Sequence, residues 1–203
     1  MFAQVIQGRT SDAKAFRSAM DRWVHDLAPS SIGWLGSTGG VTDDGRFIEV
    51  ARFESADAAG RNSARPEQSR WWQDTQQTLE GAATFADSED VTVDMHGDPD
   101  RAGFVQVMRG RVTDAARARE LMDRMNASDL ARLRPDILGT LSVRQDDGEW
   151  TQVIYFTSEA AAREGERKEM PAEAKAVMDE LMAISDGPPE FFDLREPVLD
   201  SPR

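Results

Sequence analysis

The sequence predicts an α+β fold in which one unit of about 100 residues occurs twice in tandem. Three observations predict it. The chain contains an internal repeat; each copy alternates short strand-like runs with amphipathic helical runs; and helix caps and hairpin turns separate these runs in the order βαββαβ.

The repeat is visible in two long blocks. Residues 2–22 align with residues 104–124 at an offset of 102, with 11 identities in 21 positions. Residues 43–59 align with residues 146–162 at an offset of 103, with eight identities in 17 positions. Average composition gives only about one match by chance in the first block. A weaker third block places Asp94 over Asp193.

The first copy contains a signal for each boundary. Thr10-Ser11-Asp12 supplies helix N-cap chemistry after the first strand, Asp44-Gly45 predicts a hairpin, and Ser55-Ala56-Asp57 caps the second helical region, which Pro66 interrupts. The expected elements, in order, are a strand, a helix, two hairpin strands, an interrupted helix and a closing strand, over residues 2–9, 13–27, 32–41, 46–53, 56–79 and 91–96.

The second copy repeats this order, with its hairpin at Asp147-Gly148 and its closing strand near residues 191–195. The expected domains are therefore a first repeat at 1–97, a linker at 98–102, and a second repeat with a C-terminal tail at 103–203. The order βαββαβ is the ferredoxin-like, or split βαβ, plan.

A sheet of this plan buries one face under its two helices, and its other face needs a cover. Because the second copy is already attached, we expect the two repeats to form an intramolecular pseudo-dimeric α+β barrel. No partner chain is then required, and the protein is expected to be a monomer or a homodimer.

Composition narrows the classes of partner and compartment. The net charge of −13 disfavours nucleic acid and anionic membranes as partners. The chain has no cysteine, which excludes disulfides and thiolate chemistry. The first residues show no signal-peptide pattern, and no run of about 20 apolar residues predicts a membrane helix. The expected location is the cytoplasm.

With this element order, and with segments such as residues 50–55 (VARFES), the chain resembles the dimeric α+β barrel superfamily. The resemblance is to its antibiotic-biosynthesis-monooxygenase-like branch, in an actinobacterial tandem form. It covers nearly the whole chain and rests on element order. The resemblance implies a pocket between sheet and helices within each repeat.

Haem-degrading members of that branch have an Asn on the first strand, a Trp at the end of the third and a His on the second helix. By position, these sites fall at Gln4, Phe53 and Trp72 in the first repeat, and at Gln106, Phe156 and Lys175 in the second. Neither repeat offers a histidine there, so we expect no haem. We expect no other cofactor and no metal.

The candidate ligand-binding residues follow from these positions: Gln4, Trp23, Phe53, Trp72, Gln106 and Phe156. The amides Gln4 and Gln106 lie in apolar strands, where each needs a ligand or a cross-strand hydrogen bond. The tryptophans of the first repeat form either ordinary core or an aromatic pocket wall. We expect a site, if there is one, in the first repeat.

Two functions are consistent with these features. One is a protein that binds a small molecule, such as an aromatic metabolite. The other is a cofactor-independent monooxygenase-like enzyme acting on an aromatic metabolite, which needs only a dry pocket with a few polar groups. The sequence does not decide whether the protein is an enzyme.

Overall fold

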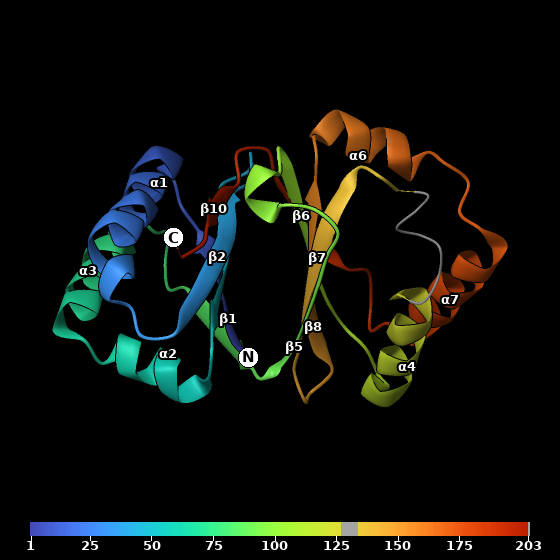
Figure 1. The fold of residues 1–203 in the computed structure, drawn as a ribbon, viewed down its shortest axis with the longest axis horizontal. Coiled ribbons are helices and arrows are strands. Elements are labelled where there is room, and N and C mark those ends of the chain that lie inside the picture. Colours follow the sequence, from blue (N-terminus) through green and yellow to red (C-terminus); the bar gives the residue numbers. More distant parts are fainter. Residues whose placement is uncertain (127–133, 203) are drawn as a thin grey trace. The chain divides into compact units, whose positions relative to one another are not determined.

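The computed structural model describes residues 1–126 and 134–202. The chain divides into two compact units (Figure 1). Unit 1 comprises Met1–Val91 together with Phe192–Arg203, and unit 2 comprises Thr92–Phe191.

Unit 1 is built on an antiparallel sheet with the strand order β10-β2-β3-β1-β4. Helices α1, α2 and α3 cover one face of this sheet (Figure 1). The elements are β1 (Phe2–Arg9), α1 (Ala13–Arg22), a π-helical turn (Trp23–Leu27), a 3-10 turn (Ala28–Ser30), β2 (Trp34–Val41), β3 (Arg46–Phe53), α2 (Ala56–Ser63), α3 (Pro66–Gln76), β4 (Thr84–Ser88) and β10 (Val198–Asp200).

The second sheet has the strand order β5-β7-β8-β6-β9. Helices α4, α6 and α7 lie on one face of it (Figure 1). The elements are β5 (Asp90–Met95), a 3-10 turn (Pro99–Arg101), β6 (Phe104–Arg111), α4 (Ala115–Asn126), β7 (Ile137–Arg144), β8 (Glu149–Phe156), α6 (Glu159–Glu166), α7 (Ala172–Ala183) and β9 (Glu190–Leu194).

The predicted α+β order of two ferredoxin-like repeats is confirmed, and the boundary signals act as expected. The Asp12 side chain accepts a hydrogen bond from the Ala15 amide at 2.9 Å. The Ser55 hydroxyl oxygen caps α2 in the same way, by accepting a hydrogen bond from the Ala58 amide at 3.1 Å. Gly45 adopts a φ of +81°, which the hairpin turn requires and which glycine tolerates without strain.

Each strand of the two sheets presents alternate side chains to the helices. In β1, Phe2 packs with Trp23, and Ile6 packs against the cluster that contains Phe16 and Phe47. Any cavity between the sheet and its helices is the space that these side chains leave unfilled. None of the described helices is long and apolar enough to cross a membrane.

The closing strand of the first sheet differs from the prediction. Residues 91–96 were expected to complete this sheet, but β5 pairs with β7 in the second sheet. The strand that closes the first sheet, next to β1, is β4. It is polar and half exposed, so its sequence TFADS shows no apolar alternation. At the other edge of the first sheet, β10 (Val198–Asp200) pairs with β2.

The third alignment block was therefore wrong. Asp193 lies on β9, beside β6, whereas Asp94 lies on β5, beside β7. The irregular pairing at Gly36 in β2 and at Gly139 in β7 identifies the true counterpart of Asp94. A Cβ atom added at Gly36 would lie 2.8 Å from the backbone carbonyl oxygen of Asp200. A Cβ atom added at Gly139 would lie 2.8 Å from the backbone carbonyl oxygen of Asp94. Asp94 thus corresponds to Asp200, and the compact units do not coincide with the sequence repeats.

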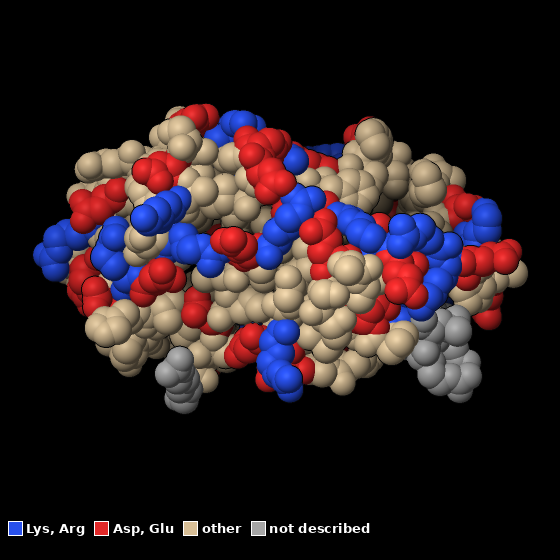
Figure 2. Space-filling view, turned by 90° about the horizontal axis from the view of Figure 1, so that it is seen from above, with Lys and Arg blue, Asp and Glu red and all other residues tan. Residues whose placement is uncertain are grey.

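Basic and acidic side chains are interleaved on the face shown in Figure 2. Many form local ion pairs on helix and strand surfaces. Arg111 contacts Glu149 at 2.8 Å, and Arg117 contacts Glu120 at 2.6 Å and also Glu180. Solvent screens exposed pairs of this kind, so the apolar cores dominate the stability of each unit.

Candidate functional site: a methionine-walled cavity in unit 2

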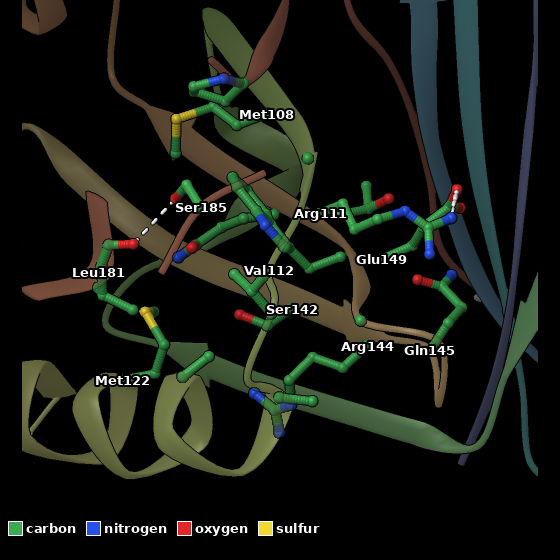
Figure 3. Close-up of a pocket in the computed structure, with 18 of the residues that line it drawn as sticks. Met108, Arg111, Val112, Met122, Ser142, Arg144, Gln145, Glu149, Leu181 and Ser185 are labelled. Carbon is green, nitrogen blue, oxygen red and sulfur yellow. Dashed lines mark hydrogen bonds and ion pairs between the residues drawn. The ribbon is translucent and has the colours of Figure 1, made fainter. Parts of the chain in front are cut away.

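Unit 2 contains a cavity of about 500 Å³ between the helix-facing side of its sheet and helices α4 and α7 (Figure 3). This volume lies within the range of about 300–1,000 Å³ that is typical of small-molecule sites. Strands β6, β7 and β8 form the floor.

Four methionines supply much of the wall: Met108, Met122, Met178 and Met182. Leu181, Trp150 and Phe191 also contribute to this apolar lining. Methionine side chains are flexible and polarisable, so they adapt to ligands of different outline. The wall therefore favours an apolar ligand without imposing one rigid shape.

Two polar side chains stand on the floor of the cavity. Ser142 on β7 and Gln152 on β8 are directly opposite each other across the strand pair. The Ser142 hydroxyl is directed toward Met122 and Leu181 (Figure 3). Within the described part of the chain, neither side chain has a hydrogen-bond partner. The pair can donate to and accept from a ligand.

Charged groups gather at one edge of the cavity, where Arg111 bonds to Asp147 at 3.0 Å and to Glu149 at 2.8 Å. A hydrogen bond from the Glu149 amide lowers the pKa of Asp147, and nearby Arg111 lowers it further. Arg111, Glu149 and Gln145 point away from the methionines (Figure 3). The ionic network thus borders the cavity and leaves its interior apolar.

The cavity arises from one difference between the repeats. In unit 1, Phe16 of α1 stacks on Phe47 with the ring centroids 4.5 Å apart. The corresponding residues in unit 2 are Ala118 and Trp150, and both line the cavity. The missing phenyl ring leaves space that no other described side chain fills.

A second difference lies on the last helix of each repeat. The bridges Thr10–Leu79 and Val112–Ser185 align α3 with α7 at an offset of 106. Trp72 therefore corresponds to Met178 and not to Lys175, which lies exposed beside Asp179. The same alignment places a buried valine, Val177, where unit 1 has Trp71.

The first-repeat candidates converge on a much smaller cavity, of about 70 Å³, in unit 1. Gln4, Trp23 and Phe53 line it, together with Trp71. Trp72 is absent from this lining and packs on Phe85, with the ring centroids 5.3 Å apart. The Gln4 amide donates to Asp87 at 2.9 Å, the structural cross-strand bond that was one of its two expected roles.

The second-repeat candidates lie at the other end of unit 2. Phe156 is buried against Phe104, with the ring centroids 5.8 Å apart. Gln106 is 8% exposed. Neither residue lines the 500 Å³ cavity. The assignment of these six residues to a ligand remains a prediction.

Sequence reasoning missed one buried ionisable group. Glu49 lies in the middle of β3, is 8% exposed and lines the small cavity of unit 1. Burial raises its pKa to about 8, the nearby Asp200 carboxylate adds to the rise, and a hydrogen bond from Ser37 opposes it. The available signal was an acid between the apolar residues Ile48 and Val50.

Metal and haem ligands are not gathered at either cavity. No group of three or more His, Asp or Glu side chains able to hold a metal occurs within residues 1–126 and 134–202. His25 is exposed beside Asp26, and His96 lies 3.5 Å from Asp94. Neither histidine lines the 500 Å³ cavity of unit 2 or the 70 Å³ cavity of unit 1.

The fold matches that of several solved structures over almost the whole chain. A candidate monooxygenase from Lactobacillus acidophilus superposes with a TM-score of 0.75 at 14% identity, covering 98% of this chain and 95% of that one. A candidate monooxygenase from Fusobacterium nucleatum gives 0.77 at 12%, covering 98% and 94%. An anthrone oxidase-like protein gives 0.71 at 11%, covering 98% and 92%.

This chain has the fold of those monooxygenase-like proteins. At 11–14% identity this match shows the fold, and it confirms the expected α+β architecture over almost the whole chain. No protein-family model and no curated protein matches the sequence.

Proposed function

We propose that the protein binds a small, mainly apolar molecule in the cavity of unit 2 and anchors one polar group of that molecule on Ser142 and Gln152. The observation that carries this proposal is the pairing of an open apolar cavity of about 500 Å³ with two polar side chains that have no hydrogen-bond partner among the described residues. Binding sites combine an apolar wall with a few such orienting groups.

The ligand class follows from the lining. Met108, Met122 and Trp150 offer contacts to an apolar or aromatic ring system. A hydroxyl or carbonyl oxygen on that ring can accept from the Gln152 amide, and a hydroxyl can also donate to the Gln152 side-chain oxygen. A strongly charged ligand is disfavoured beside the methionines, because burying a charge against an apolar wall is costly and the lining residues Arg111 and Glu149 already pair with each other.

Calorimetry with 1-naphthol and naphthalene tests the proposal. We expect wild type to bind both, with 1-naphthol tighter. Replacing Gln152 by Ala removes a hydrogen-bonding anchor worth about 0.5–1.5 kcal/mol, so 1-naphthol binding should weaken about 2- to 10-fold while naphthalene binding is unchanged.

The substitution Ala118→Phe supplies the ring that unit 1 has at this position and should abolish binding of both probes. Its matched control is Ala183→Phe, which adds the same ring at an exposed position of α7 outside the lining. Undiminished binding in a folded Ala118→Phe variant would contradict the proposed location.

A second candidate function is a cofactor-independent oxygenase acting on an aromatic metabolite. It is supported by the neighbours described as candidate monooxygenases and as an anthrone oxidase-like protein. The test is oxygen uptake with anthrone, whose conversion to anthraquinone consumes one O₂ and releases one water. Uptake above the uncatalysed rate that disappears in Ala118→Phe supports an enzyme; binding without uptake supports a binding protein alone.

A further inference from the structure

Unit 1 contains two carboxyl groups that face one small cavity. Glu49 lies on β3 and Asp200 on β10, and both line the space of about 70 Å³ beneath Trp23 and Trp71. Among the described lining residues there is no Lys, Arg or His. The described lining of this cavity is therefore acidic and aromatic.

We propose that this cavity is a binding site for a small organic cation of the methylated ammonium class, held by the Glu49 carboxylate under the rings of Trp23 and Trp71. It is separate from the apolar site of unit 2 and is formed only by residues of unit 1.

The backbone makes room for the Glu49 carboxyl group. Glu49 faces Gly39 on β2 across the strand pair. A Cβ added at Gly39 would lie 1.8 Å from Glu49 Oε2, so any larger residue would displace the acid. Unit 2 has Ser142 and Gln152 at these two positions, so this arrangement is specific to unit 1.

The Glu49 carboxyl group accepts a hydrogen bond from the protein, but one of its two oxygens has no partner among the described residues. The Ser37 hydroxyl donates to it, and Trp34 Nε1 in turn donates to the Ser37 oxygen at 3.1 Å. Glu49 Oε2 is buried and has no hydrogen-bond partner among the described residues. A buried carboxyl oxygen without a partner is costly, so a positive charge beside it would be stabilised, and an N–H group on the cation could also donate to it.

The surrounding charges favour a cation. Asp200 pairs with Ser37 across β2 and β10 and adds a like charge next to Glu49. The basic residues of β3, Arg46 and Arg52, alternate to the opposite face of the sheet. A cation in the cavity would reduce both the repulsion between the two acids and the cost of burying Glu49 as a carboxylate.

The aromatic wall fits the same ligand class. Trp23 and Trp71 have ring centroids 6.4 Å apart at an interplanar angle of 62°. Their indole N–H groups are already bonded, to Gln68 at 2.7 Å and to the Ala19 carbonyl at 2.8 Å. The indole donors are thus not available to a ligand, and the aromatic rings that line the cavity can attract ammonium groups through their π-systems. The small volume excludes ligands of drug or metabolite size.

Binding should be linked to proton release. The cation pairs with ionised Glu49, whose pKa of about 8 leaves it mostly protonated at neutral pH. Affinity should therefore rise with pH, because fewer protein molecules must first lose a proton. From pH 9 to pH 6 the ionised fraction, and with it the affinity, should fall about 100-fold.

The experiment is a titration of the full chain with methylammonium and tetramethylammonium chlorides at constant ionic strength, with sodium chloride and tert-butyl alcohol as controls. Indole NMR resonances of Trp23 and Trp71 report the site, and calorimetry in two buffers reports the released proton. We expect saturable shifts of both resonances at pH 9 and binding about 100-fold weaker at pH 6.

Glu49→Gln keeps the shape of the neutral acid and should abolish the response at every pH. Asp200→Asn removes the like charge and should move the pH dependence to lower pH. The control Asp57→Asn removes one exposed charge from α2 and should leave the response intact. An absent response to both cations at pH 9, an equal response to tert-butyl alcohol, or a response that persists in folded Glu49→Gln would overturn the proposal.

Discussion

The buried Glu49 carboxyl group should make the stability of the protein depend on pH, whether or not a ligand is bound. The folded state raises the pKa of this carboxyl group from its ordinary value of 4.5 to about 8. Between these two values the folded protein holds a proton that the unfolded chain releases. Stability should therefore fall as the pH rises from about 4.5 to about 8, and the total loss should be on the order of 5 kcal/mol. The variant Glu49→Gln does not titrate and should lack this loss.

Urea unfolding from pH 5 to pH 9, followed by tryptophan fluorescence, measures this effect. Four of the five tryptophans precede residue 73, so the signal reports mainly on unit 1. The difference in unfolding free energy between wild type and Glu49→Gln should change by at most about 1.4 kcal/mol per pH unit, in favour of the variant as the pH rises. Parallel pH profiles of the two proteins would refute the reasoning, because Glu49 would then titrate alike in the folded and unfolded chains.

Three further predictions concern packing and strand pairing. Gly39→Ala places a methyl group on Glu49 Oε2 and should cost about 1–3 kcal/mol in urea unfolding; a cost near zero would show that the acid can move aside. Phe16→Ala removes the ring stacked on Phe47 and should cost about 3–5 kcal/mol while enlarging the cavity of unit 1; a xenon or benzene titration would detect the added space. Ending the chain before Val198 removes β10, so amide exchange should accelerate along β2 and remain slow in β6 and β8; unchanged protection of β2 would contradict the observed pairing.

Much of the fold follows from local sequence signals. Asp12 and Ser55 cap helices because their side chains reach backbone amides three residues ahead. Asp44-Gly45 turns a hairpin because glycine accepts a positive φ. The assignment of β4 and β5 failed because pairing partners are set by tertiary contacts, and the polar sequence of β4 carries no periodic signal.

The candidate site was harder to predict. Gln4, Trp23 and Phe53 line one small cavity of unit 1, and their role in binding stays a prediction. The sequence left the tryptophans as either core or pocket wall, and in unit 1 their rings occupy most of the available space. The larger cavity depends on Ala118, where the sequence differs from Phe16 by a loss of volume. Such a loss is visible only when the two repeats are compared position by position.

The position of β10 has a consequence for the order in which the chain is made. A ribosome synthesises β2 about 160 residues before it reaches β10, yet β2 pairs with that strand. During this interval the outer edge of β2 exposes unpaired backbone groups, which favour mispairing with other chains. Unit 1 can therefore complete its sheet only after residues 198–200 have left the ribosome, although its other strands emerge first.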